Sequence, residues 1–554
     1  MLTQRVTAFS LMGGRQHLLR GTTHAAIESG FHANVRMADG KFESASLSEQ
    51  NEQPIGPLSP DAESRPGLLR VLGPGIAIAI VVGNVIGSGI YAKPGKIAAV
   101  AGDFNLILAA WVTGGVLCIL GSLCFAELAV MLPRAGGMYV YLREAYGRVL
   151  AFLFGWTDFI FGRPASIGAL SMIFVGSLQR ATGWELSPVG EILLAFAVIG
   201  VTAWINVLGV IWGGSVQGIA TALKAGFLAL VAALPFLLPL FGGEGVNPDN
   251  YGSTLTATAA VPTDAVATMP ADEDTTAAEP KSTAATFALV LLAVMWAYNG
   301  WHGITPIAEE VRNPARNIPL ALFVGIGLLI VLYVSANIAY HGVLTMDEMA
   351  LKENQEHVAE LMVNRLVGPI GLKLMSASVM LSVLGAINAN LLLGPRVSFA
   401  MGRDDVFFRS LGRVHVNYRT PAAAIILQAI MGMTLILASA LLVRYVAALQ
   451  DTNIFDLLTN YAIFSGSIFY MLAVLAVIVL RIKHPEWERP YRTLGYPVTP
   501  IAYLVFYSCF LYYVYTGQPT EANIGLVLIA IGIPAYYGYR WWAKQNPETL
   551  HDGQ

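Results

Sequence analysis

The sequence predicts an all-α membrane protein with about twelve transmembrane helices. Of its 554 residues, 55% are hydrophobic and only 12% are charged, and the mean hydropathy is +0.59. A chain this apolar and this poor in charge is not an ordinary soluble domain. The second observation is a series of apolar runs of about twenty residues, each long enough to cross a bilayer as a helix. The predicted spans cover residues 71–98, 104–131, 149–178, 189–207, 211–241, 285–309, 318–342, 367–394, 421–443, 454–481, 496–516 and 522–542.

The segments outside the spans indicate how the chain is divided. Residues 1–70 are polar and lack the apolar core and cleavage site of a signal peptide, so we expect a disordered cytoplasmic tail. Lys and Arg gather in alternate short loops, which places both termini in the cytoplasm of a multi-pass protein of the plasma or inner cell membrane. Residues 242–284 are acidic and predict a disordered external loop. The remaining divisions are 71–241 for the first five helices, 285–481 for the next five, 482–543 for the last two and 544–554 for a cytoplasmic C-terminal tail.

The first span contains an interruption. Gly87 and Gly89 flank Ser88 near the middle of the apolar run, and glycine lacks the side chain that penalises leaving helical backbone angles. Unwinding there frees backbone N–H groups near Ile90, which are costly in a membrane unless a polar group fills the gap. A carboxylate would fill it, because the start of the outer half-helix carries partial positive charge and spare donors. The alternative is that these glycines only allow close helix packing.

The sixth span carries a second interruption, with Gly300, Gly303 and Pro306 in the middle of its apolar run. Each interrupted span stands first in a set of five helices. Matched discontinuous helices of this kind are typical of an inverted repeat with a binding site at the midplane of the membrane. The pattern therefore predicts a five-plus-five inverted repeat with discontinuous helices 1 and 6, followed by two C-terminal helices.

Charged residues inside the predicted spans need partners, because a lone charge is costly in a bilayer. Glu127 lies near the cytoplasmic edge, within reach of the interface or of a nearby arginine. Asp158 and Arg163 are five residues apart, about 140° around a helix, so the spacing disfavours a direct pair and each is expected to find another partner. Lys224 lies deep in the fifth span, and we expect it to face the bundle interior and meet carbonyls or a hydroxyl group.

Several short motifs follow one another in a fixed order along the chain. They are Gly87-Ser88-Gly89-Ile90, Phe125-Ala126-Glu127-Leu128, Arg163-Pro164-Ala165-Ser166, Glu309-Glu310 with the run from Asn313 to Pro319, and Gly402-Arg403-Asp404. Together they resemble the amino acid, polyamine and organocation (APC) superfamily. Within it, the set is most similar to the L-type amino acid transporters.

This resemblance implies a substrate site on the two interruptions. The carboxylate of an amino acid would bind the backbone at the first break, and its ammonium group would lie on carbonyls at the second. Trp296 falls where relatives have an aromatic gate over the substrate. The implied substrate-binding residues are Ile86, Gly87, Ser88, Gly89, Ile90, Trp296, Ala297, Asn299, Gly300 and His302.

The resemblance also bears on coupling and on partners. Lys224 matches the fifth-helix lysine of sodium-independent members, whose ammonium group replaces a sodium ion and links helices 1 and 8, here near Ser382. A lysine and a sodium ion would repel each other there, so sodium coupling is disfavoured. Relatives commonly have glycine at Asn299 and a small polar residue at His302, so a narrower pocket is expected. The loop 178–191 contains no cysteine, so a disulfide-linked ancillary subunit is not expected.

The sequence thus predicts a secondary transporter that moves amino acids across the lipid bilayer by alternating access, without sodium, either by exchange or with proton coupling. The alternative is a membrane sensor that binds an amino acid without moving it. An enzyme is not predicted, because the charged residues of the spans lie in different layers and offer no nucleophile with a matched base. The sequence shows no metal-ligand cluster, no cofactor motif and no basic patch for nucleic acid.

Overall fold

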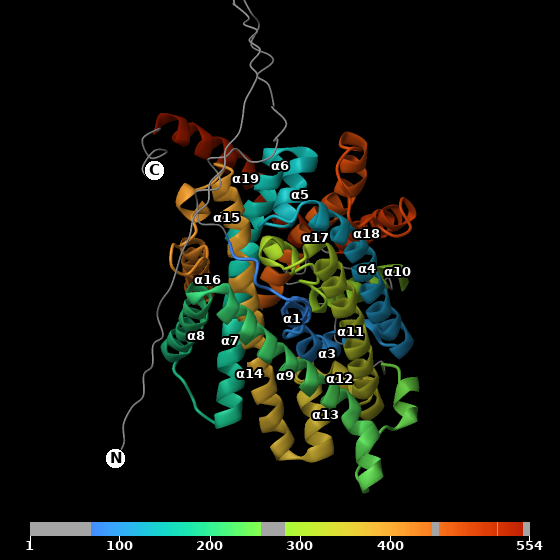
Figure 1. Ribbon diagram of the computed structural model, residues 1–554. Coiled ribbons are helices and arrows are strands. Elements are labelled where there is room, and N and C mark those ends of the chain that lie inside the picture. Colours follow the sequence, from blue (N-terminus) through green and yellow to red (C-terminus); the bar gives the residue numbers. More distant parts are fainter. Residues whose placement is uncertain (1–67, 256–282, 446–453, 518, 547–554) are drawn as a thin grey trace, which may run out of the picture. The chain divides into compact units, whose positions relative to one another are not determined.

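The computed structural model describes residues 68–255, 283–445, 454–517 and 519–546 (Figure 1). These residues form helices joined by loops, with an isolated bridge between Leu72 and Val311. In this part of the chain, 11 helical segments are long and apolar enough to cross a membrane. The predicted all-α membrane fold is confirmed. Most of the predicted N-terminal tail, acidic loop and C-terminal tail lies outside the described residues.

The first set of five spans begins with an interrupted helix. Proline stands at the start of α1 and of α8, where its fixed φ suits the first helical turn. The elements of this set are α1 (Pro74–Val85), α2 (Gly89–Ala92), α3 (Pro94–Ala101), α4 (Phe104–Met131), α5 (Met138–Tyr146), α6 (Arg148–Thr157), a π-helical turn (Asp158–Gly162), α7 (Arg163–Thr182), α8 (Pro188–Leu208) and α9 (Val210–Leu237).

The second set also begins with an interrupted helix, α10. This helix is 15 residues long and ends halfway through the predicted span 285–309, which is why it is not among the 11 full-length spans. The elements of this set are α10 (Thr283–Ala297), a 3₁₀ turn (Thr305–Glu310), α11 (Pro314–Val343), α12 (Met346–Ala350), α13 (Val358–Val367), α14 (Pro369–Leu393), α15 (Pro395–Arg403), α16 (Ala422–Tyr445) and α17 (Ile454–Lys483). Helices α18 (Val498–Gly517) and α19 (Pro519–Gln545) follow.

The two sets correspond in order and lie in opposite orientations. In the first set, the short helix α5 connects the second span to the third. In the second set, α12 and α13 connect the seventh span to the eighth. Figure 1 shows α5 at one end of the bundle and α12 and α13 at the other end. This placement is what an inverted repeat requires.

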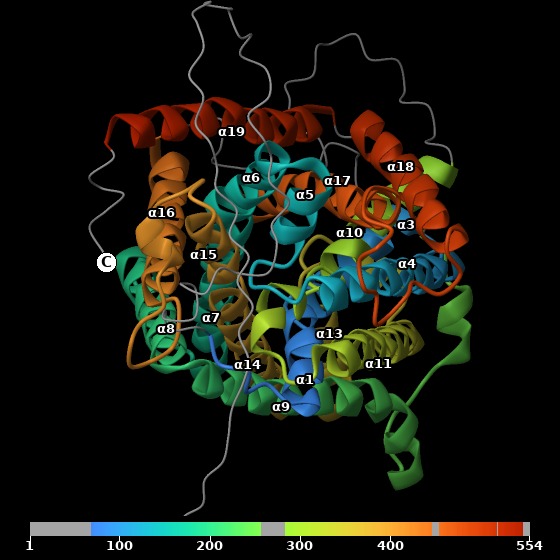
Figure 2. The same ribbon diagram turned by 45° about the horizontal axis from the view of Figure 1, so that its top comes forward.

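Helix α1 lies in the interior of the bundle, packed against α9, α11 and α14 (Figure 2). Its residues Ala77, Ile80 and Val81 are fully buried, as expected for a helix that is apolar all round. Helix α11 approaches closely because it carries Gly325 at the contact, where a Cβ atom would lie 2.8 Å from Cγ1 of Val81. Close packing of α1 therefore holds its interrupted end at one position in the interior of the bundle.

Ion pairs join the elements at the end of the bundle that carries α5. The buried carboxylate of Glu127 accepts hydrogen bonds from Arg481 at 2.6 and 2.9 Å and from the N–H of Thr493 at 2.7 Å. The expectation that Glu127 reaches an arginine is confirmed. Glu310 and Arg396, both fully buried, form a second pair at 2.9 Å, which ties the end of the second broken helix to α15.

Candidate functional site

The first break separates α1 from α2. Helix α1 ends at Val85, and the chain leaves helical geometry at Ile86, where φ is −68° and ψ is 92°. Four backbone N–H groups in and just after this gap find no acceptor in the described part of the chain. They belong to Gly87, Ser88, Gly89 and Ile90. Donors left unmet at this depth favour a polar ligand or water beside them.

The carbonyl groups of the same break do have partners. The Lys224 ammonium, fully buried in α9, donates to the carbonyls of Gly83 and of Ile86, the latter at 2.6 Å. The Ser382 hydroxyl of α14 donates to the same Ile86 carbonyl at 3.2 Å. Three helices are joined at this point, and the protein itself satisfies the carbonyls of Gly83 and Ile86.

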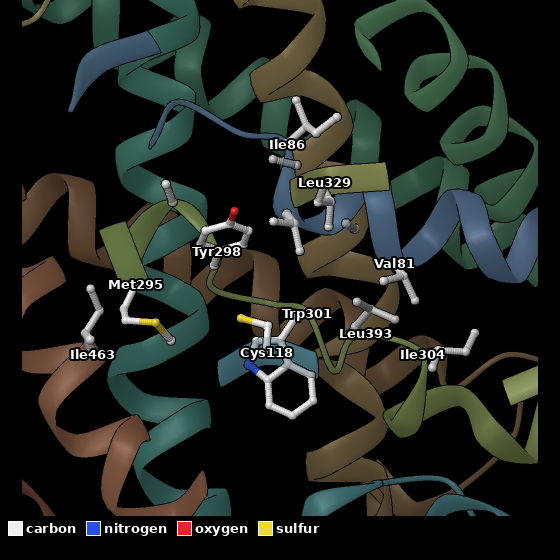
Figure 3. Packing of buried hydrophobic residues seen from close by; sticks show 14 of the residues in the cluster. Val81, Ile86, Cys118, Met295, Tyr298, Trp301, Ile304, Leu329, Leu393 and Ile463 are labelled. Carbon is white, nitrogen blue, oxygen red and sulfur yellow. The ribbon is translucent and has the colours of Figure 1, made fainter. Parts of the chain in front are cut away.

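The second break follows Ala297 at the end of α10. The chain then runs through turns to Thr305, and Gly300 has φ of 92°, a left-handed conformation that side chains disfavour. Figure 3 shows Met295 on the helical ribbon of α10, and Trp301 and Ile304 on the irregular chain that follows. The helix is therefore interrupted near the middle of the predicted span.

The two breaks contact each other directly. A Cβ atom on Gly89 would lie 2.7 Å from Cα of Ala297, so only glycine fits at this crossing. Asn84, in the last turn of α1, donates from its side chain to the carbonyl of Gly300 at 2.8 Å. The Tyr333 hydroxyl of α11 lies 3.0 Å from the carbonyl oxygen of Val85 and 3.2 Å from that of Ala297, one on each broken helix.

A cavity of about 320 Å³ lies against both breaks. Eight of the ten predicted substrate-binding residues line it, namely Gly87, Ser88, Gly89, Trp296, Ala297, Asn299, Gly300 and His302. Ile86 and Ile90 do not line it, because their side chains are fully buried in the apolar core. Lys224 and Ser382 lie behind the first break and hold its backbone. The volume suits a small molecule, since ligand pockets begin at about 300 Å³.

The chain matches the amino acid permease family over residues 73–534. It belongs to this family. The serine/threonine exchanger SteT of Bacillus subtilis is 30% identical over 477 residues, covering 86% of this chain and 98% of the relative. The Asc-type amino acid transporter 1 of Mus musculus is 29% identical and covers 88% and 84%. The mouse large neutral amino acids transporter small subunit 2 is also 29% identical, covering 90% and 87%.

These findings confirm two expectations. The resemblance to APC-type transporters, including L-type relatives, is correct. The family and its named relatives are permeases, exchangers and transporters, so the expectation that the chain is not an enzyme is confirmed as well.

The cavity wall also contains an ion pair that the spacing along the sequence had disfavoured. Nε of Arg163 lies 3.2 Å from Oδ1 of Asp158, so the two residues pair directly. The prediction assumed α-helical spacing, but residues 158–162 form a π-helical turn. In a π-helix the bonding pattern is i to i+5, which brings residues five apart onto one face. Both residues line the cavity of this permease.

Other lining residues were not predicted. The Tyr470 hydroxyl of α17 donates to the side-chain oxygen of Asn299 at 2.9 Å, and its ring centroid lies 4.9 Å from that of His302. The His302 Nδ1 atom is buried and has no hydrogen-bond partner among the described residues. Tyr470 lies in an apolar run where an aromatic residue is typical of a packed core, so no sequence signal marks it as a lining residue.

A second cavity of about 660 Å³ lies on the other side of the first break. Lys96 of α3 and Glu356, which precedes α13, both line it and pair at 2.8 Å. Ser88 and Ala165 line both cavities. The first break of the permease therefore stands between two chambers.

Proposed function

We propose that this permease is a sodium-independent secondary active transporter that moves amino acids by alternating access. The observation that carries the proposal is one cavity bounded by both broken helices, with unmet N–H donors on the first. The carboxylate of an amino acid accepts hydrogen bonds from such donors, and its ammonium group donates to carbonyl oxygens of the second break. Residues at the two breaks, including Ser88 and Asn299, are proposed to contact the substrate, with Trp296 as the gate.

Lys224 supports the absence of sodium coupling. Its ammonium group donates to the Ile86 carbonyl, and the Ser382 hydroxyl donates to the same oxygen. The groups that would coordinate a cation between α1 and α14 are therefore already engaged. A sodium ion placed beside the ammonium group would also be repelled by it.

The two cavities support alternating access. Ser88 and Ala165 are the residues they share, so a substrate on the first break lies between two chambers. Occupancy would favour movement of α1 and the broken α10 against the surrounding helices. The name of the Bacillus subtilis relative favours exchange of one amino acid for another over proton-coupled uptake. The names of the relatives refer to amino acids with different side chains, serine and threonine in one and large neutral amino acids in another. They therefore do not indicate which side chain the substrate of this permease has.

Further parts of the proposal come from the sequence. The chain is proposed to lie in the plasma or inner cell membrane with both termini in the cytoplasm and an acidic external loop at residues 242–284. Residues 71–241 and 285–481 are proposed as the two repeats. No disulfide-linked ancillary subunit is proposed, because the loop 178–191 lacks cysteine.

Counterflow into proteoliposomes tests this function. Vesicles preloaded with a mixture of neutral amino acids should accumulate labelled amino acid from outside at equal rates with and without sodium. The variant Ser88→Trp fills the cavity at the first break and should abolish counterflow while the folded protein stays in the membrane. Binding without counterflow would instead identify a sensor, and a strict need for sodium would contradict the role of Lys224.

A further inference from the structure

The ion pair in the cavity wall is incompletely paired. Arg163 donates to Asp158 only through Nε, at 3.2 and 3.4 Å from the two carboxylate oxygens, and Nη1 donates to the side-chain oxygen of Asn390 at 3.2 Å. In the described part of the chain, Nη2 has no acceptor, yet it is not among the buried unpaired atoms. The side chains of Asp158 and Arg163 keep 15% and 11% of their exposure. Both residues and Asn390 line the cavity.

This arrangement differs from an ion pair that serves packing alone. A guanidinium group binds a carboxylate best through two parallel N–H bonds, and a side-on contact through one nitrogen leaves donors unused. An ion pair buried in a membrane protein is costly unless further hydrogen bonds satisfy it. The unused donor Nη2 and the carboxylate oxygens can therefore still bind a ligand in the cavity.

The two opposite charges of the pair restrict which ligand fits. A cationic side chain that approaches Asp158 also approaches Arg163, and an anionic side chain that approaches Arg163 also approaches Asp158, so either charge meets a like charge. A neutral hydroxyl or amide group meets no such repulsion. It accepts from Nη2 and donates to the carboxylate, and so uses both partners at once.

We propose that Asp158, Arg163 and Asn390 form a side-chain subsite that selects amino acids with a neutral hydrogen-bonding side chain. The proposal rests on the function proposed above, because the backbone of the substrate must lie on the two breaks. Aromatic and aliphatic lining residues, among them Phe161 and Phe469, form other parts of the wall. A hydroxyl or amide placed against apolar wall would lose its hydrogen bonds to water, which directs it to the ion pair.

Binding of matched amino acids to the purified protein tests the subsite. Threonine and valine have nearly the same shape and differ by a hydroxyl in place of a methyl group, and asparagine and leucine form a second pair. We expect the dissociation constant of threonine to be at least about tenfold lower than that of valine. The dissociation constant of asparagine should be lower than that of leucine by a similar factor. Equal affinities within both pairs, in protein that performs counterflow, would overturn the subsite and leave the proposed function intact.

The double variant Asp158→Leu with Arg163→Met replaces the pair by apolar side chains and leaves no isolated charge. Replacing a buried ion pair by apolar side chains of similar volume often leaves the free energy of unfolding unchanged or increases it. The preference for threonine over valine should fall from about tenfold to about one. An unchanged preference would mean that the pair serves packing only. Arg163→Lys keeps the charge without the forked second nitrogen and should weaken the preference, which tests the subsite if the double variant does not fold.

The pair Glu348–Arg365 provides a matched control. It joins α12 and α13 at 2.6 Å and lines neither cavity. Glu348→Gln breaks this ion pair in the same protein and should keep the wild-type preference for threonine. A preference lost equally in Glu348→Gln would overturn the assignment to the cavity wall.

Discussion

The two broken helices are held in different ways. The first break is fixed from behind by Lys224, Ser382 and Tyr333, which come from three different helices and satisfy its carbonyl groups. The second break is bound by Asn84 of the first broken helix and by Tyr470 of α17, and the Tyr333 hydroxyl reaches it as well. The first break is therefore anchored by a buried ammonium group and keeps free N–H donors, whereas the second break is bound by neutral side chains.

This difference indicates how the work of the site is divided. An anchored backbone with unmet N–H groups is preorganised for a carboxylate, which every amino acid carries. The second break is bound to Asn84 and Tyr470 through single neutral hydrogen bonds, which are weaker than the charged bonds that Lys224 donates to the first broken helix. Disturbing the anchors of the first break should therefore cost more than disturbing contacts shared with the second.

The largest effect is expected at Lys224. Lys224→Met leaves the Gly83 carbonyl without a donor, at about 1–3 kcal/mol, and leaves the Ile86 carbonyl with the Ser382 hydroxyl alone, at about 1 kcal/mol more. It should reduce counterflow by about 100-fold. The matched control is Thr221→Val, one turn earlier on α9. Its hydroxyl donates to the carbonyl of Ala79 at 2.9 Å, in the regular part of α1. Losing that bond should lower the melting temperature slightly, with far less effect on counterflow. Equal losses in both variants would contradict a special role for the anchor.

The next effect is expected where the two breaks cross. Gly89→Ala forces a methyl group against the backbone of Ala297 and should reduce uptake by about 30-fold or more through displacement of the second break. At Gly87 an added Cβ would meet Cβ of Ala386 and the carbonyl oxygen of Val85, each at an ordinary 3.9 Å. Gly87→Ala should therefore reduce uptake by less than about tenfold. The initial rates of both variants, normalised to protein in the vesicles, decide the comparison. The reverse order would show that the crossing does not limit transport.

The smallest effect is expected at Tyr333, whose hydroxyl contacts both breaks. Tyr333→Phe removes these bonds and keeps the ring, and because a hydroxyl group has one proton, the variant loses at most about one full hydrogen bond. We expect a loss of about 1 kcal/mol, or about five- to tenfold in uptake. Kinetic analysis should show a higher KM with little change in the maximal rate, because the breaks would be less well ordered before substrate binds. A loss as large as that of Lys224→Met would place the main anchor at Tyr333 instead.

Much of this architecture could be predicted from the sequence. The apolar runs gave the spans, and glycines in mid-span gave both breaks, because glycine and proline have local backbone consequences that survive tertiary packing. Lys224 was predicted to meet carbonyls or a hydroxyl group, since a deeply buried cation needs such partners, and it does so. Each of these features depends on the local sequence and on the depth of a residue in the membrane.

The rest depended on geometry that spacing alone does not give. The Asp158–Arg163 pair was judged from α-helical periodicity, and a single π-helical turn reversed the outcome. Tyr470 and Asn390 come from helices far apart in the sequence and reach the cavity only through tertiary packing. The position of a side chain on a buried, uniformly apolar helix has no periodic signal, so the lining of the cavity could not be predicted in full.

The most direct test of the account is a structure of the protein with a bound amino acid. The account predicts the carboxylate oxygens at about 2.7–3.2 Å from backbone nitrogens between Gly87 and Ile90, with the ammonium group facing the second break. An amino acid bound elsewhere, with the nitrogens of the first break donating to water or to the protein, would contradict it.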